Sequence, residues 1–305
     1  MLQLKTARSF ERSGSLNRNP AAILLWLCLL VTSCCLPAVT QGSQLTLDVM
    51  SFNVRWDGLD TGRNAWQNRL PVVVELFESV SPDVCGLQEP SKTQTLDLDR
   101  ELPDYSYYLG DHSRDETIPI FYKHTRLTLL DSGSFWLIDE SELSGGTRRC
   151  VWVRLKDKRT EKSFYVYNCH LDHRASDSRF QCVRNLVRNI AVRKHADSFV
   201  ICGDFNEREQ GKAMRFMGGE RDSLGVNEAI PDLILYDTFR VLHPPGENQG
   251  TGHGFKGAKD RGRIDYVWSG EGIKLLESRV IYFNRNGLYP SDHFPVLTRV
   301  EIPEP

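Results

Sequence analysis

Residues 199–206 read Phe199-Val200-Ile201-Cys202-Gly203-Asp204-Phe205-Asn206, an apolar run that ends in a glycine and two polar side chains. Short apolar runs closed by glycine are typical of buried β-strands. Because Asp204 and Asn206 are two residues apart, an extended backbone places both side chains on one face. A turn could use the same two residues, but the wholly apolar lead-in favours a polar site at the end of a strand.

Other polar residues occupy the same kind of position elsewhere in the chain. Each lies at the end of, or inside, a run with strand character: Asn53, Glu89, His170, Asp265 and the pair Asp292-His293, which is framed by Pro290 and Pro295. Taken singly, each of them has a structural explanation as a turn residue, a cap or a hydrogen-bonded core group. A carboxylate at the mouth of an apolar strand is nevertheless costly unless it is paired or binds a metal.

Together these positions supply a chemically coherent set of groups. The set contains two carboxylates, two amides and two imidazoles: Glu89 and Asp292, Asn53 and Asn206, His170 and His293. Asp265 is the natural partner for His293, because a carboxylate fixes the tautomer of an imidazole and stabilises its charged form. Hard oxygen ligands beside imidazoles suit Mg²⁺ or Mn²⁺ acting on a phosphate ester.

The rest of the chain predicts an α+β protein rich in short strands. Strands are expected at 45–54, 84–88, 118–122, 150–155, 164–171, 199–202, 264–268, 278–283 and 294–300. Two amphipathic helices are expected, one with Leu70, Val73, Val74 and Phe77 on one face and Pro71 at its start, the other with Phe180, Val183, Val187 and Ile190 on one face. No repeat or Pro/Gly-rich linker interrupts the chain, so residues 44–305 are predicted to form one domain. Residues 250–262, rich in glycine, are expected to form a long mobile loop that approaches the site.

In this order the motifs resemble those of the endonuclease/exonuclease/phosphatase superfamily, which has the DNase I-like fold. The resemblance covers about Leu45 to Val300, and it depends on the combination, because each motif alone is weak. Residues 118–122, 168–173 and 287–290 resemble a secreted and bacterial-type branch. The resemblance implies a four-layer α/β/β/α sandwich, in which two packed mixed β-sheets are flanked by helices.

The resemblance also implies a role for each site residue. Glu89 would hold the metal, with Asn53 and Asp292 nearby. Asp204 would orient and activate the attacking water, while Asn206 and His170 would contact the phosphoryl oxygens. His293, held by Asp265, would stabilise charge or act as the acid-base group. Arg148 is expected to contact the substrate phosphate. Glu116 is expected to be a solvated loop acid, and His173 is expected to be a core histidine.

The predicted function is that of a metal-dependent phosphoesterase, of the phosphodiesterase or nuclease type, that cleaves a P–O bond by in-line attack of an activated water. A phosphomonoesterase or a lipid phosphodiesterase of the same fold is the alternative. A catalytically silent binding protein on this scaffold is an alternative of another class. Without residues 1–43, the chain has 34 basic against 39 acidic residues, so nucleic acid is a possible substrate that the charge does not indicate. No obligate protein partner is indicated, and a monomer is expected.

The first 43 residues have the layout of a secretory signal. Four basic residues precede the apolar run 21–31, and small and polar residues follow it. This predicts a secreted or extracellular protein, although residues 21–38 carry no charge and could instead be a short membrane anchor. Five cysteines remain beyond this segment, and Cys85, Cys169 and Cys202 lie in apolar runs where buried free thiols are expected.

Overall fold

The computed structural model describes residues 44–110, 117–138, 148–221, 224, 231, 233–246 and 249–303. The expectations for residues 1–43 and for Glu116 lie outside these ranges. Among the described residues, no helix has both the length and the apolar character needed to cross a bilayer.

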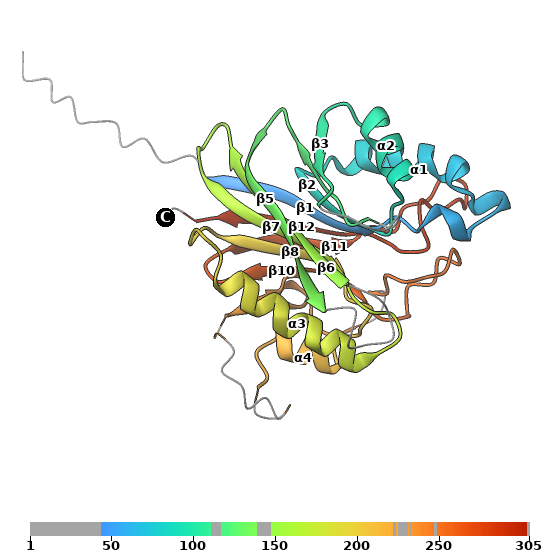
Figure 1. Ribbon diagram of the computed structural model, residues 1–305. Helices are drawn as coiled ribbons and strands as arrows, with labels where there is room; N and C mark the ends of the chain where they lie inside the picture. The colour runs from blue at the N-terminus through green and yellow to red at the C-terminus, as the bar shows by residue number, and fades with distance from the viewer. Residues whose placement is uncertain are drawn as a thin grey trace, which may run out of the picture. The chain divides into compact units, whose positions relative to one another are not determined.

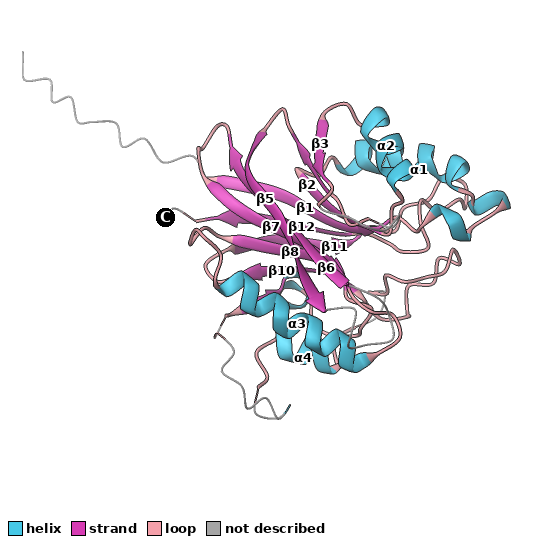
Figure 2. Cartoon of the chain, viewed as in Figure 1, coloured by secondary structure: helices cyan, strands magenta, loops and turns pink. Residues whose placement is uncertain are grey.

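Within the described ranges, twelve strands form two six-stranded mixed sheets (Figure 2). The first sheet has the order β11-β12-β1-β2-β4-β3 and contains β1 (Leu45–Asn53), β2 (Val84–Gln88), β3 (Tyr105–Tyr108), β4 (Ile120–Lys123), β11 (Lys274–Val280) and β12 (Val296–Ile302). The second sheet has the order β5-β6-β7-β8-β10-β9 and contains β5 (Leu127–Ile138), β6 (Arg148–Asp157), β7 (Ser163–His170), β8 (Phe199–Asp204), β9 (Leu235–Asp237) and β10 (Asp265–Gly270). Each sheet has one parallel pair, β1 with β2 and β7 with β8.

Helices cover the outer faces of the two sheets (Figure 1). These helices are α1 (Trp66–Val80), α2 (Lys92–Glu101), α3 (Ser176–Ala191) and α4 (Lys212–Met217). The short helix α5 (Thr238–Leu242) instead lies between β10 and β11, and Phe239 joins the cluster between the sheets. Two short 3₁₀ turns are η2 (Asp57–Leu59) and η3 (Gly62–Asn64). In Figure 1, α1 and α2 lie against the first sheet, and α3 and α4 lie against the second. The arrangement confirms the predicted α/β/β/α sandwich.

Three apolar clusters correspond to the three interfaces between these layers. The central cluster joins the facing sides of the sheets, with Val49 and Val84 from the first and Val166 and Val200 from the second. Separate clusters pack α1 against the first sheet and α3 with α4 against the second. Buried apolar area is the main stabilising contribution in each interface.

The boundaries of α1 differ from the prediction. The helix begins at Trp66, so Pro71 lies inside it and does not mark its start. Its fully buried apolar face is formed by Val72, Val73, Leu76 and Phe77, while Leu70 and Val74 are only partly buried. Pro71 is the sixth residue of the helix, beyond its first turn, so it removes the hydrogen bond that a backbone N–H would donate to the carbonyl of Gln67. The second predicted helix is confirmed, since Phe180, Val183, Val187 and Ile190 are all buried in α3.

The five described cysteines are buried and free: Cys85, Cys150, Cys169, Cys182 and Cys202. Burial raises the pKa of every one of these thiols. The prediction of buried free thiols is therefore confirmed for Cys85, Cys169 and Cys202, and a thiol with a raised pKa is a poor nucleophile.

The parallel pairs position the polar residues. Parallel neighbours end at the same edge of a sheet, so Asn53 lies opposite Gln88 in register, next to Glu89, and His170 lies opposite Asp204. The antiparallel strand β10 begins at this same edge, with Asp265 opposite Asp204. The ends of five strands from both sheets thus deliver polar side chains to one region.

Candidate active site

Asn53 joins the two sheets at this edge. Its Nδ2 donates to Glu89 Oε1 at 2.9 Å and to Asp204 Oδ2 at 3.0 Å. Its Oδ1 accepts from the backbone N–H of Arg55 at 2.9 Å. Because Asn53 and Glu89 belong to the first sheet and Asp204 to the second, one fully buried amide ties both halves of the site together.

The backbone is strained at three positions around this amide. Arg55, Glu89 and Asn206 have φ values of 64°, 69° and 50°. Left-handed backbone is costly for residues other than glycine, and it persists where the surrounding structure fixes it, often at functional sites. Each of the three residues directly follows a strand or lies two residues beyond one, so the strain re-orients the chain as it leaves the sheet.

Asp204 is the central carboxylate of the site. It is 1% exposed, and its Oδ2 lies 3.7 Å from His170 Nε2 and 3.9 Å from His293 Nδ1. Burial raises the pKa of Asp204, the charge of Asp265 adds to the increase, and the two histidines act in the opposite direction. A carboxylate with a raised pKa is suited to accept a proton from water.

His293 and Asp265 form a hydrogen-bonded pair. His293 Nδ1 lies 2.9 Å from Asp265 Oδ2. Burial by itself lowers the pKa of His293, but the charge and hydrogen bond of Asp265, with smaller contributions from Asp204 and Asp292, hold this pKa well above its usual value. The imidazole is therefore stabilised in its charged form, and Nε2 is the ring nitrogen left for a substrate.

His170 and Asn206 lie on the other side of Asp204. Asn206 Nδ2 is 3.1 Å from His170 Nε2 and donates to the backbone carbonyl of Leu171 at 3.0 Å. Its backbone N–H donates to Asp204 Oδ1 at 2.8 Å. A contact between this amide and a phosphoryl oxygen would replace one of its contacts within the protein.

Asp292 lies next to a cation that the sequence did not single out. Arg55 Nη1 is 3.4 Å from Asp292 Oδ2, and Arg55 Nε is 3.2 Å from Asp60 Oδ2. Burial raises the pKa of Asp292, while the charges of His293 and Arg55 lower it and the charge of Glu89 raises it. The negative charges of Glu89 and Asp292 thus repel each other, and a cation bound near them would offset this repulsion.

The donor set of this region fits a hard divalent cation. Glu89 Oε1, His170 Nε2 and Asp204 Oδ2 all lie within 4.8 Å of one another, and Asn53 contacts two of these residues. Carboxylate and amide oxygens are the ligands that Mg²⁺ and Mn²⁺ prefer. The ligand atoms that gather here belong to Glu89, His170 and Asp204, whereas Asn53 presents its Nδ2 to Glu89 and Asp204 and its Oδ1 to the backbone N–H of Arg55. Of the three residues predicted to hold the metal, this cluster includes Glu89.

A buried hydrogen-bond network supports the site from below. Gln88 Nε2 donates to Asn168 Oδ1 at 2.7 Å, and Asn168 Nδ2 donates to the carbonyl of Leu87 at 2.7 Å. The two side chains connect β2 with β7 across the central core. Gly86 permits this close approach, because a Cβ at this position would lie 2.8 Å from the Asn168 side chain and from Cys202. The network fixes the strand ends that carry Glu89 and His170.

Arg148 and His173 lie further out than the other predicted residues. Arg148 begins β6. Burial raises the pKa of Asp172, but two backbone hydrogen bonds and the charge of Arg148 lower it. No described contact joins Arg148 to Asp204 or Glu89. His173 is exposed, and its Nε2 accepts from Arg174 Nε at 3.0 Å. The prediction of a core histidine is wrong, because the chain has left β7 and turns toward α3 at this point.

Arg69 is a second site residue that sequence reasoning missed. Its guanidinium is fully buried and donates to the backbone carbonyls of Val54 and Arg55, at 2.6 and 3.2 Å, and of Pro290, at 2.9 Å. Arg69 therefore links the segment after Asn53 to the segment that contains Asp292 and His293. Burial lowers the pKa of Arg69 to about 10, so the side chain stays charged at neutral pH. A lone arginine on an amphipathic helix carries no signal that could have distinguished it from a solvated one.

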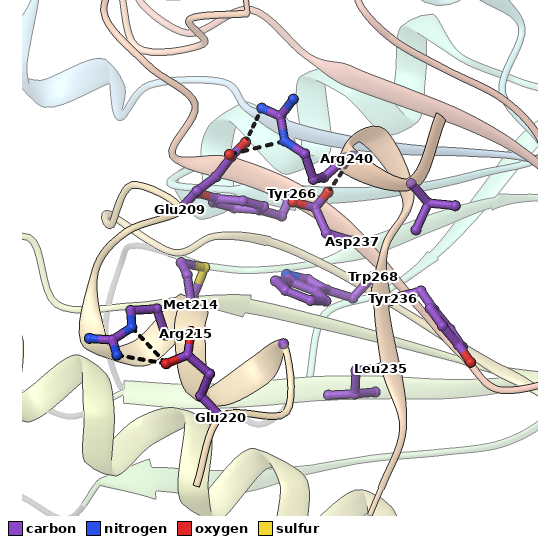
Figure 3. A pocket seen from close by; sticks show the side chains of 12 residues that line it. Glu209, Met214, Arg215, Glu220, Leu235, Tyr236, Asp237, Arg240, Tyr266 and Trp268 are labelled. Carbon is purple, nitrogen blue, oxygen red and sulfur yellow. Dashed lines mark hydrogen bonds and ion pairs between the residues drawn. The ribbon is translucent and has the colours of Figure 1, made fainter. Parts of the chain in front are cut away.

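A cavity of about 360 Å³ lies on the outer face of the second sheet, away from these residues (Figure 3). Its walls include Met214, Leu235 and Trp268, with ion pairs between Glu209 and Arg240 and between Arg215 and Glu220 at its edge (Figure 3). Asp265 and Trp268 lie on the same strand, but Trp268 belongs to the outer apolar cluster. None of the predicted catalytic or metal-binding residues lines this cavity.

Comparison with known proteins gives a family match over most of the chain. The model of the Endonuclease/Exonuclease/phosphatase family matches residues 50–293. Among curated proteins, RNA exonuclease NGL1 of Saccharomyces cerevisiae is 24% identical over 204 residues, which are 58% of this chain and 56% of the yeast protein. The chain spans a little over half the length of the curated relatives that it matches.

Solved structures share the fold. An endonuclease/exonuclease/phosphatase from Bacteroides vulgatus superimposes with a TM-score of 0.74 and 25% identity, covering 85% of this chain and all of that one. The mannosyl-6-phosphatase Bt3783 of Bacteroides thetaiotaomicron superimposes with a TM-score of 0.68 and 24% identity, again covering 85% of this chain and all of that one. At this identity the second comparison concerns the fold alone.

Proposed function

Because the chain belongs to the endonuclease/exonuclease/phosphatase family, whose activities are hydrolyses of phosphoester bonds, we propose that it is a divalent-metal-dependent phosphoesterase of the phosphodiesterase type. The observation that carries the proposal is the position of Asp204. This buried carboxylate lies between His170 and His293 and receives a hydrogen bond from Asn53, which also contacts Glu89. A proton acceptor, two imidazoles and a carboxylate that can bind a metal therefore surround one point.

The metal, held by Glu89, Asn53 and Asp292, would neutralise phosphate charge and polarise the scissile P–O bond. Asp204 accepts a hydrogen bond from the attacking water, orients it and receives its proton as the water oxygen forms the new P–O bond. The scissile P–O bond breaks on the opposite side of the phosphorus, and the leaving oxygen takes a proton from solvent. The charged imidazole of His293, fixed by Asp265, faces the phosphoryl oxygens through Nε2 and stabilises the charge that develops on them. His170 stabilises the same oxygens from the other side of Asp204.

The curated yeast relative supports the diester assignment, since it bears the name of an RNA exonuclease. The complete set of polar residues argues against a silent binding protein, because each group that hydrolysis requires is present and lies near the others. No described stripe of basic side chains lines the site, so we do not assign nucleic acid as the substrate.

The test is a panel of phosphoesters with Mg²⁺ or Mn²⁺, each with and without a chelator. We expect hydrolysis of bis-p-nitrophenyl phosphate to exceed that of p-nitrophenyl phosphate, and EDTA to abolish it. Asp204→Ala should lower kcat by about 10³-fold, the size typical of a lost general base, with an unchanged circular dichroism spectrum.

Single-stranded RNA, double-stranded DNA, sphingomyelin and inositol phosphates extend the panel. Hydrolysis of p-nitrophenyl phosphate alone would show a monoesterase instead, and hydrolysis of sphingomyelin alone would show a lipid phosphodiesterase. No hydrolysis of any compound, or full activity in Asp204→Ala, would overturn the proposed function.

A further inference from the structure

Residues 250–257 pack against both partners of the His293–Asp265 pair. Thr251 Oγ1 accepts from the backbone N–H of Asp265 at 3.2 Å, and the Thr251 carbonyl accepts from Phe294 N at 2.8 Å. Gly252 forms a β-bridge with His293. Thr251 is fully buried, so the segment is a packed part of the site and differs from the mobile loop that its glycines predict.

His253 is the fully buried imidazole of this segment, and the mechanism above leaves it without a role. Its backbone N–H donates to the carbonyl of Asp292 at 2.8 Å, and Gly254 N donates to the same carbonyl at 3.0 Å. Its ring stacks on Phe294, with centroids 3.9 Å apart and an angle of 25° between the planes. The residue therefore contacts the chain on both sides of His293.

The hydrogen-bond pattern fixes the tautomer of His253. Gly257 N donates to His253 Nδ1 at 3.2 Å, so Nδ1 is the acceptor and the neutral ring carries its hydrogen on Nε2. Burial is the main cause that lowers the pKa of His253 to about 4, which keeps the ring neutral at neutral pH.

The Nε2–H group is buried without a hydrogen-bond partner among the described side-chain and backbone atoms. The backbone of His293 acts to raise the pKa of His253, against the lowering effect of burial. A fully buried donor without a partner is costly, so His253 is held here by its other contacts.

We propose that His253 is a positioning residue for the acid-base pair: its ring, stacked on Phe294 and fixed by the hydrogen bond that Nδ1 accepts from Gly257 N, holds the Asp292–Phe294 segment so that His293 stays on Asp265. The expected effect of His253 on catalysis rests on the proposed function. The positioning of His293 itself is a statement about geometry, and it can be measured without a substrate.

Three variants separate the parts of this role. His253→Phe keeps an aromatic ring against Phe294 but removes both ring nitrogens. His253→Gln restores a side-chain oxygen that can accept the hydrogen bond from Gly257 N. Lys256→Ala is the matched control, because Lys256 is exposed and lies on the same segment. Thermal unfolding of all three shows whether each variant folds.

On the best diester substrate, we expect His253→Phe to lower kcat by about 10- to 100-fold, as is usual when a group supporting an active-site residue is lost. We expect KM to change less than threefold, since binding groups are untouched. His253→Gln should recover at least part of kcat, and Lys256→Ala should match the wild type. A kcat for His253→Phe within twofold of the wild type, in a folded protein, would overturn the proposal.

The second readout is the imidazole proton that His293 donates to Asp265, observed by NMR as a downfield resonance. It should shift or broaden in His253→Phe and persist in His253→Gln and Lys256→Ala. An unchanged resonance in all three variants would also overturn the proposal. If the wild type hydrolyses nothing but the resonance still responds to His253→Phe, the positioning role stands and the proposed function fails.

Discussion

Arg55 places a positive charge against the carboxylates that we expect to hold a metal. Its guanidinium contacts Asp292 and Asp60, and the charges of Asp292, Asp60 and Glu89 raise its pKa against the lowering effect of burial. A cation bound between Glu89 and Asp292 would be repelled by this guanidinium. Arg55 therefore balances the charge of the site and opposes metal binding at the same time.

We predict that Arg55→Ala binds Mg²⁺ more tightly than the wild type, by about 3- to 10-fold, because a partly exposed charge at this distance contributes on the order of 1 kcal/mol. Isothermal titration calorimetry with Mg²⁺ or Mn²⁺ measures the change. Arg63→Ala is the control, since Arg63 is exposed on η3 and bonds only a backbone carbonyl, that of Asn286. Equal or weaker binding by Arg55→Ala would show that the guanidinium does not oppose the metal.

Among the elements, α2 has a defined role beside the site. The helix begins two residues after Pro90, and its N-cap Ser91 forms a capping box with Gln94. Gln94 Oε1 also accepts from the backbone N–H of Asp57 at 3.0 Å, and Gln94 Nε2 donates to the carbonyl of Arg55 at 2.9 Å. The start of α2 thus fixes both the turn after Glu89 and the segment after Asn53.

Ser91→Ala should lower the free energy of unfolding by about 1 kcal/mol, the usual cost of a lost N-cap. Urea denaturation measures this change. Thr93→Ala is a suitable control, because Thr93 is exposed within the same helical turn and makes no capping contact. A loss of stability in Thr93→Ala as large as that in Ser91→Ala would argue against the capping box as the cause.

Elements also differ in how well their pattern predicts them. β5 was missed because it is an edge strand whose side chains are mostly half-buried, and its register shifts near Asp131 and Ile138 break the period of two. The short elements β3, β9, α2, α4 and α5 were missed as well. They carry too few apolar residues, or too weak a period, to be distinguished from loops.

At the scale of the whole molecule, the two sheets are also joined at the end opposite the site. Arg126 Nη1 contacts Asp83 Oδ2 at 2.6 Å beside the first sheet, and Arg126 Nε contacts Asp157 Oδ2 at 2.9 Å at the end of β6 in the second. Its Nη2 donates to the carbonyl of Thr46 in β1. Asp157 is fully buried, and Arg126 supplies the positive charge for its carboxylate, whose Oδ1 also accepts from the backbone N–H groups of Arg159 and Thr160.

Arg126→Ala should cost about 3 kcal/mol, since it leaves a buried carboxylate unpaired. Arg299→Ala, which removes a bidentate but exposed ion pair with Asp48, should cost less than about 1 kcal/mol. Chemical denaturation of both variants gives the comparison. Equal losses of stability in the two variants would show that burial of the carboxylate does not determine how much an ion pair stabilises the fold.

The same contact predicts how stability depends on pH. Burial acts to raise the pKa of Asp157, but the hydrogen bonds from Arg126 and Thr160 outweigh it and lower the pKa. A lowered pKa in the folded state gives stability that is present above the ordinary aspartate pKa and is lost as pH falls through the folded value. The wild type should therefore lose more stability below about pH 4 than Arg126→Ala does, as measured by urea denaturation across pH.

The sequence alone determined the strand-rich α+β class and the polar residues at the strand ends, while the sandwich was implied by the resemblance of its motifs to a known superfamily. It could do so because buried strands leave apolar runs and because a carboxylate or imidazole at the end of such a run is costly without a partner. Tertiary structure alone decided that Arg55 and Arg69 belong to the site, that His253 packs beside His293, and that Arg148 and His173 lie further out. These placements depend on contacts between segments far apart in the chain, and no local pattern of residue types records them.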